Sequence, residues 1–144
     1  MHDSEQLQFI DTNILIYAHD RSAGVKHQQA RDLIATLWQH GNGCLSIQVL
    51  QEFYVNVTRK VAHPLSPENA SQIIADLSNW TVHQPNVADL LEAIRIQQRF
   101  QLSFWDAMIL VSALRLDCHT LWSEDLNSGQ QYEQLRVLNP FALS

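Results

Sequence analysis

Residues Phe9 to Ala18 read FIDTNILIYA, an apolar run that Asp-Thr-Asn interrupts once. A short apolar segment bounded by turn-forming residues predicts a buried β-strand, which places Asp11 at the carboxyl end of that strand. Ligands bind at this edge in open α/β sheets. Asp11 or Thr12 is equally suited to cap the helix that follows, because Asp and Thr are favoured at helix N-termini. The stretch therefore leaves two roles open for Asp11, a structural one and a functional one.

The composition predicts a single globular domain over residues 1–144. Hydrophobic residues make up 46% of the chain and charged residues 17%, as in ordinary folded proteins. The chain contains no Gly-, Ser- or Pro-rich linker and no internal repeat. It also has neither a signal-peptide pattern nor an apolar run of the roughly 20 residues that span a bilayer. We therefore expect a cytoplasmic protein without a membrane partner.

Strand-like segments recur along the chain after the first one. We expect them at four places: Cys44–Ile47, Trp80–His83, Thr120–Ser123 and Leu135–Leu138. One or two helices separate each strand from the next, except for the shorter last connection. Parallel neighbours require such long crossover connections. The alternation therefore predicts an α/β fold with a parallel sheet and helices on both faces.

Capping residues and helical spacing predict the helices between these strands. Gly41-Asn42-Gly43 ends the first helix, Ser66-Pro67 and Asn86 each open a helix, and another runs from Ser103 to about Leu116. Gln48–Lys60 is helical as well. The buried stripes are expected at Val25, Leu33, Ile34, Leu37 and Trp38, at Ile73, Ile74 and Leu77, and at Leu90, Leu91 and Ile94.

Four acidic residues are expected to meet at one edge of this sheet. Asp11 follows the first strand and Asp125 the fourth, Glu52 lies in the helix after the second strand, and Asp106 lies in the first turn of the Ser103 helix. The carboxyl ends of parallel strands share one edge, so we predict a carboxylate cluster there. Each residue taken singly also fits an ordinary structural role. Asp106 and Ser103 have the spacing of a capping box. Glu52 fits the solvated face of a helix, and Asp125 fits a turn.

Carboxylates that lie close together repel one another by several kcal/mol unless they are protonated or paired. We therefore expect a cation among them. Oxygen ligands from a few carboxylates suit Mg²⁺ or Mn²⁺. Zinc is disfavoured because the seven histidines are scattered and the two cysteines, Cys44 and Cys118, lie far apart in the sequence. A divalent metal held in this way activates water and polarises a phosphoryl oxygen, as phosphodiester hydrolysis requires.

The segments that carry the four acidic residues resemble the motifs of the PIN domain family. They are FIDTNILIYA, LQEFY, SFWDAMILVSA and LWSEDLNSG, in the order and rough spacing of that family. The resemblance extends over essentially the whole chain. It implies a three-layer α/β/α Rossmann-like fold with a five-stranded parallel sheet and a ribonuclease site that depends on Mg²⁺ or Mn²⁺.

The resemblance also implies a role for individual residues. The catalytic positions correspond to Asp11, Glu52, Asp106 and Asp125. All but Glu52 are expected to bind the metal, and Asn13 and Ser123 correspond to polar positions that support the site. Glu124 adjoins Asp125, and the alignment of the Ser-Glu-Asp segment favours Asp125 as the inward carboxylate.

Small PIN proteins of this size are most often similar to the toxins of bacterial toxin/antitoxin pairs. The resemblance therefore implies an RNA substrate, a cognate antitoxin and a homodimer. Phosphate binding usually requires a basic surface, whereas this chain has a net charge of −6. Four of its fifteen acidic residues belong to the expected metal site, which leaves eleven against nine basic residues. The remaining imbalance of −2 is compatible with an RNA substrate.

Other function classes fit the sequence less well. A haloacid-dehalogenase-type phosphatase requires a second Asp two residues after the first, and Asn13 occupies that position. A nucleotide-binding protein requires a glycine-rich phosphate loop, which the chain lacks. The alternative that remains is a non-catalytic PIN-fold module that binds RNA or protein. Four carboxylates favour the enzyme, because a binding surface has no need of their mutual repulsion.

Overall fold

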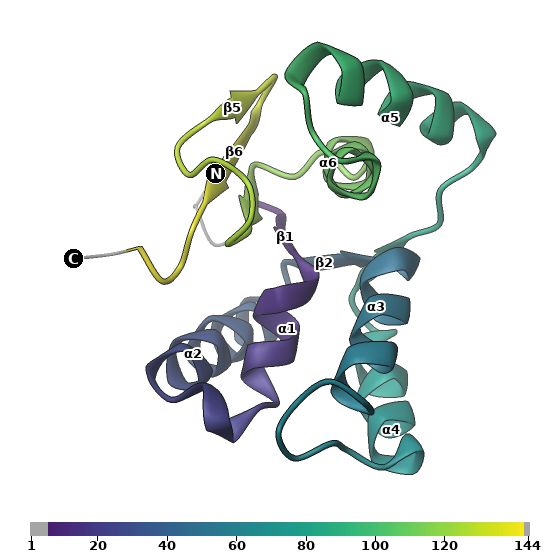
Figure 1. The fold of residues 1–144 in the computed structure, drawn as a ribbon. Coiled ribbons are helices and arrows are strands. Elements are labelled where there is room, and N and C mark those ends of the chain that lie inside the picture. Colours follow the sequence, from purple (N-terminus) through teal and green to yellow (C-terminus); the bar gives the residue numbers. More distant parts are fainter. Residues whose placement is uncertain (1–5, 143–144) are drawn as a thin grey trace.

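The central sheet of the protein orders its strands β3-β2-β1-β4-β6-β5 (Figure 1). The structure is a computed structural model that describes residues 6–142. The strands are β1 (Gln8–Ile10), β2 (Gly43–Ser46), β3 (Thr81–His83), β4 (Thr120–Trp122), β5 (Gln131–Tyr132) and β6 (Leu135–Leu138). The predicted parallel sheet is confirmed for five strands, and β5 adds an antiparallel edge. β5 has only two residues, too few to show the alternation of apolar and polar side chains that indicates a strand.

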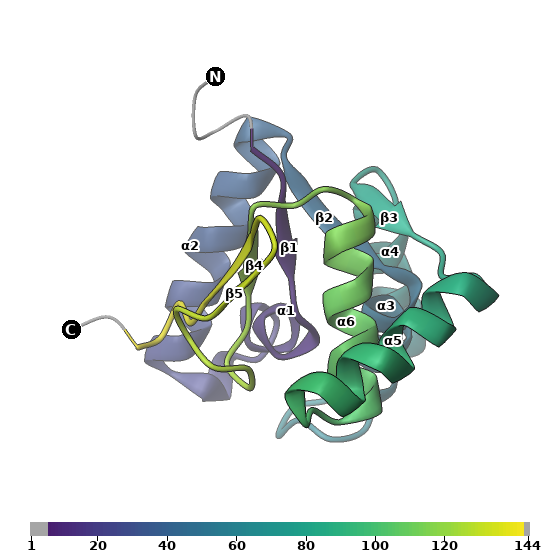
Figure 2. The ribbon, with the colours of Figure 1, turned by 90° about the horizontal axis from the view of Figure 1, so that it is seen from above.

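Helices cover both faces of this sheet. They are α1 (Thr12–Ala18), α2 (Val25–His40), α3 (Ile47–Val57), α4 (Pro67–Leu77), α5 (Val87–Phe100) and α6 (Phe104–Arg115), with a short 3-10 turn η2 (Arg21–Ala23). α5 and α6 lie on one side of the sheet and α1 and α2 on the other (Figures 1 and 2). α3 and α4 pack against each other. The expected three-layer arrangement is confirmed.

The ends of α2 differ from the prediction in one respect. Gly41 ends the helix with a φ of 68°, a left-handed conformation that glycine adopts without strain. The expectation that Val25 and Trp38 are buried is wrong, because their side chains are 74% and 43% exposed. The helix buries only Ala30, Ile34 and Leu37, so its buried face is narrower than the expected stripe.

The buried face of α5 is also different from the expected one. Three residues predicted to face inward are 38% to 59% exposed: Leu90, Leu91 and Ile94. The helix instead buries Asp89, whose carboxylate accepts a hydrogen bond from Arg115 Nε at 2.7 Å and lies 3.2 Å from His83 Nε2. Asp89 also forms a capping box with Asn86. Asp89 shares the buried face of α5 with Ala93 and Ile96, and the leucine-rich face lies toward solvent.

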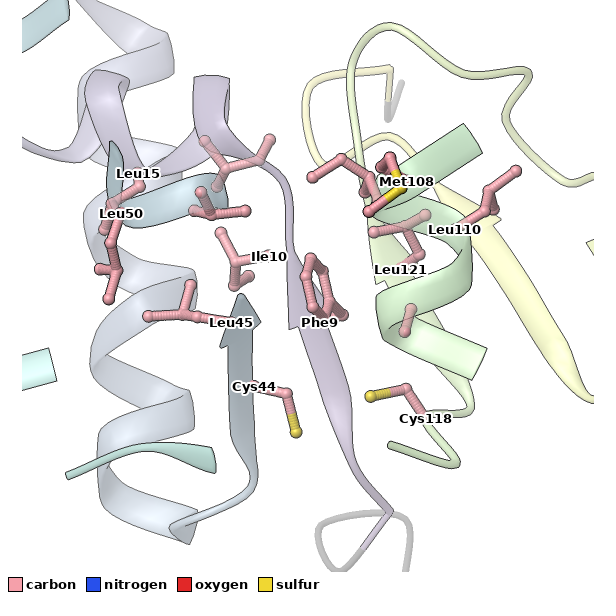
Figure 3. Close-up of a cluster of buried hydrophobic side chains, with 14 of the residues drawn as sticks. Phe9, Ile10, Leu15, Cys44, Leu45, Leu50, Met108, Leu110, Cys118 and Leu121 are labelled. Carbon is pink, nitrogen blue, oxygen red and sulfur yellow. The ribbon is translucent and has the colours of Figure 1, made fainter. Parts of the chain in front are cut away.

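β1 passes through the hydrophobic core. Phe9 and Ile10 are fully buried, and Figure 3 shows them among side chains of the neighbouring strands and of α6. Cys44 and Cys118 are free buried thiols whose sulfur atoms point toward each other. Among residues 6–142, no helix is long and apolar enough to cross a bilayer.

Candidate active site

Asp11 lies where β1 and β4 end together. Its backbone N–H donates to the carbonyl oxygen of Trp122 at 2.9 Å. Its carboxylate accepts hydrogen bonds from Thr12 N at 2.7 Å and from Ser123 Oγ at 2.8 Å. Asp11 is therefore the N-cap of α1 and also a buried carboxylate at the carboxyl edge of the sheet. The capping role is confirmed, and the functional role of this buried carboxylate stays a prediction.

The pKa of Asp11 rises from 3.8 to about 7. Burial is the main cause, and the negative charges of Asp125 and Asp106 add to it. Hydrogen bonds from Ser123 and Thr12 act in the opposite direction without cancelling the rise. A large part of the Asp11 population is therefore protonated near neutral pH when no cation is present.

Asp106 begins the buried helix α6 without using its carboxylate for the cap. Ser103 Oγ accepts a hydrogen bond from Asp106 N at 3.1 Å, which is one half of the expected capping box. The returning bond from the Asp106 carboxylate to the backbone of Ser103 is absent, and within residues 6–142 this carboxylate accepts no hydrogen bond. The carboxylate is therefore available to the site, and the backbone alone serves the cap.

Two side chains hold the Glu52 carboxylate, one from the start of α1 and one from the start of α3, the helix that carries Glu52. Thr12 Oγ1 donates to Glu52 Oε1 at 2.5 Å, and Gln48 Nε2 donates to Glu52 Oε2 at 3.2 Å. Gln48 Nε2 also lies 3.2 Å from the carbonyl oxygen of Trp105, which binds α3 to the first turn of α6. Glu52 therefore does not lie on a solvated helix face.

The loop after β4 separates the two carboxylates of the Ser-Glu-Asp segment. Asp125 accepts a hydrogen bond from Asn13 Nδ2 at 2.9 Å, whereas Glu124 is bound by Tyr17 and Lys26. Burial raises the pKa of Asp125, and the charge of Asp106 raises it further. Burial would also raise the pKa of Glu124, but the bonds from Lys26 and Tyr17 outweigh burial and lower it. Asp125 is thus the carboxylate turned toward the other acids.

The four acidic side chains line one cavity of about 250 Å³, together with Asn13, Gln48, Asn56 and Trp105. A larger cavity of about 450 Å³ lies elsewhere, between α2 and α4, and Asp76 is the one carboxylate in its lining. We therefore assign the site to the smaller, acidic cavity. The expected meeting of carboxylates at the sheet edge occurs there.

The donors of this cavity suit a hydrated divalent cation. Within residues 6–142, no three His, Cys, Asp or Glu side chains lie close enough together to enclose a metal ion. Mg²⁺ commonly keeps several waters and binds one or two carboxylates directly, so it does not require such an enclosure. The oxygen-only donors and the raised pKa of the buried Asp11 both fit a cation at this place.

The comparison with protein families agrees with this geometry. The model of the PIN domain family matches residues 9–130, which include all four acidic positions. The chain belongs to the PIN domain family. No curated protein matches this PIN domain chain.

Solved structures with the same fold include three from bacterial toxin systems. A toxin-antitoxin complex from Klebsiella pneumoniae has a TM-score of 0.67 at 17% identity, and the match covers 94% of this chain and 99% of that one. The Mycobacterium tuberculosis toxin VapC20, described as cleaving the sarcin-ricin loop, has a TM-score of 0.62 at 18% identity, covering 82% and 91%. DNA-bound VapBC from Salmonella typhimurium has a TM-score of 0.65 at 16% identity, covering 94% and 98%. These likenesses show the fold of this PIN domain.

Two residues of the PIN domain site escape the sequence-based prediction. Gln48 lies one helical turn before Glu52, a spacing that puts both on one face of α3 and offers a usable signal. Its Oε1 atom is buried and has no hydrogen-bond partner within the described residues. For Thr12 the sequence predicts only a capping role. No periodicity or motif links it to Glu52, which is 40 residues away.

The metal-free PIN domain is expected to lose stability as pH rises through the titration range of Asp11. The folded state keeps the proton up to about pH 7, whereas the unfolded chain releases it near pH 3.8. This contribution is therefore fully present below pH 3.8 and is lost as pH approaches 7. Asp11→Asn removes the ionisation, so between pH 5 and pH 8 its stability relative to wild type should rise by about 2 kcal/mol. Urea unfolding in EDTA measures this difference, and a difference independent of pH would contradict it.

Proposed function

We propose that this protein is a Mg²⁺- or Mn²⁺-dependent endoribonuclease that hydrolyses phosphodiester bonds in RNA. The observation that carries the proposal is the meeting of four carboxylates in one cavity, with Asp11 buried among them. A cation there would offset the repulsion and favour the ionised form of Asp11. Membership of the PIN domain family supports a nuclease as the class of enzyme.

The acidic residues of the cavity and the two side chains that hold Asp11 and Asp125 have separate roles in this proposal. Asp11, Asp106 and Asp125 would hold the hydrated metal, one or two of them directly and the others through its bound water. When bound, the metal would activate water and polarise a phosphoryl oxygen of the substrate. Ser123 orients Asp11 and Asn13 orients Asp125 through their hydrogen bonds. Glu52 is held in place from both sides and is positioned to accept a proton from water beside the substrate.

Trp105 supports an RNA substrate with an unpaired strand. Its side chain is 61% exposed and borders the acidic cavity, next to Asp106. A flat aromatic surface in this place can stack a base that lies beside the cleaved phosphate. Bases are available for such stacking where RNA is single-stranded, in loops, bulges and ends.

The direct test is cleavage of RNA by the purified protein. We expect total bacterial RNA to be cut in millimolar Mn²⁺ or Mg²⁺ and to stay intact in EDTA, because the proposed chemistry requires the metal. Gel electrophoresis of the products with 5′-end mapping measures this activity. RNA binding without metal-dependent cleavage would contradict the enzyme and favour the non-catalytic PIN-fold module.

We further propose that the protein is the toxin of a toxin/antitoxin pair in the cytoplasm. The toxin-antitoxin complexes of Klebsiella pneumoniae and Salmonella typhimurium that share its fold support an antitoxin partner. The homodimer implied by the family resemblance is part of this proposal, and light scattering of the purified protein tests it.

A further inference from the structure

The loop after β4 carries two neighbouring carboxylates that bind different partners. Asp125 lines the acidic cavity, whereas Glu124 is bound from α1 and α2. Asp125 is exposed, and Asn13 holds its carboxylate through a hydrogen bond of 2.9 Å. The position of this carboxylate therefore also depends on what holds the adjacent backbone of the loop.

Glu124 is held through both of its carboxylate oxygens. Tyr17 Oη donates to Glu124 Oε1 at 2.7 Å, and Lys26 Nζ forms an ion pair with Glu124 Oε2. Lys26 Nζ also lies 5.1 Å from the centre of the Tyr17 ring and 5.3 Å from that of Phe141, within the range of cation–π contacts. The Tyr17 and Phe141 rings meet edge to face at 5.3 Å. Two helices thus hold Glu124, and Phe141 after β6 packs against the two side chains that hold it.

We propose that Lys26 and Tyr17 form a clamp on Glu124 that positions Asp125 for metal binding. The inference rests on the proposed metal-dependent function. Ser123 anchors the other side of the same loop, because its Oγ accepts from Asp125 N at 3.2 Å and from Leu126 N at 3.3 Å. The clamp and Ser123 together leave the loop little freedom at Asp125.

Lys26 has a second effect on the acidic cavity. It places a positive charge beside Glu124, whose carboxylate adjoins Asp125 in the sequence. Without this cation the loop would be repelled by the acids that it must approach. Lys26 does not line the acidic cavity, so it acts as a positioning residue through Glu124. Groups of this kind typically change metal affinity by about 10- to 100-fold when they are removed.

The affinity for Mn²⁺ tests the clamp without reference to cleavage. Lys26→Met and Glu124→Gln in the full chain should each weaken Mn²⁺ binding by about tenfold in calorimetric titrations. Lys26→Arg keeps the charge and its donors and should bind nearly as wild type does. Lys60→Met is the matched control, because Lys60 is the only other lysine of the chain and lies exposed after α3. It should leave the affinity unchanged.

Amide hydrogen exchange in the metal-free protein provides the second measurement. The N–H groups of Asp125 and Leu126 should exchange faster in Lys26→Met and Glu124→Gln, and at the wild-type rate in Lys60→Met. Wild-type Mn²⁺ affinity in both clamp variants would overturn the clamp and leave the proposed function standing. Wild-type protein that binds no Mn²⁺ would overturn the proposed function, and the clamp's role in metal binding with it. Faster exchange would then show only that Lys26 and Glu124 order the loop.

Discussion

Asp11→Asn and Asp106→Asn are each expected to reduce metal-dependent RNA cleavage by roughly 10³-fold or more while the protein stays folded. An amide removes a negative oxygen ligand, and a metal supplies several kcal/mol of stabilisation to the transition state. Each 1.36 kcal/mol corresponds to about tenfold in rate. Single-turnover cleavage in Mn²⁺ measures the loss, and circular dichroism with urea unfolding checks that the variants fold.

Asp106→Asn is the more informative of the two variants, because the structure separates its two possible roles. The cap of α6 uses Ser103 Oγ and the backbone N–H of Asp106, both of which the variant keeps. Ser103→Ala is the matched control, since it removes the cap at a cost of about 1 kcal/mol and keeps the carboxylate. It should lose stability and retain cleavage. An Asp106→Asn protein that unfolds or that cleaves at the wild-type rate would contradict the assignment.

Expression of the chain alone is expected to arrest bacterial growth, and its cognate antitoxin is expected to restore it. The arrest follows from cleavage of cellular RNA, so Asp11→Asn should abolish it. A partner segment that carries Arg or Lys could enter the acidic cavity, offset its charge and compete with both metal and substrate. The gene to test is the neighbouring short reading frame, in which we expect a DNA-binding start and a tail that folds on binding.

Growth curves after induction, with and without the neighbouring gene, measure these effects. Asp11→Asn expressed to the same level is the control for a burden that does not depend on cleavage. Growth that is unaffected by the wild-type chain would contradict the toxin assignment, even if purified protein cleaves RNA in Mn²⁺. Relief of the arrest without binding to the purified chain would contradict occlusion of the site.

Much of the fold could be predicted because its signals are local. The parallel strands follow short apolar segments, and β6 spans the predicted range Leu135–Leu138. The capping residues Ser66, Asn86 and Ser103 occupy the predicted places at the starts of α4, α5 and α6. Each of these signals concerns residues within one or two turns of the chain, where backbone preference and capping decide the outcome.

The burial of individual helix faces could not be predicted in the same way. Leu90, Leu91 and Ile94 have the spacing of a buried stripe, yet α5 turns them outward. The face that α5 buries instead carries Asp89, Ala93 and Ile96, and Asp89 bonds to Arg115, which is 26 residues away on α6. Spacing alone shows that a helix has an apolar face, whereas burial depends on which neighbour the helix meets.

By itself, the sequence determined the alternation of strands and helices and, through the parallel sheet, the edge at which Asp11, Asp106 and Asp125 meet. Only the tertiary structure decided that Thr12 holds Glu52, and that Lys26 and Tyr17 turn Glu124 away from Asp125. The physical reason is the distance along the chain between the partners. Periodicity and capping act between near neighbours, whereas the bonds on Glu124 join residues 98 and 107 positions apart, which come together only when the sheet and its helices have packed.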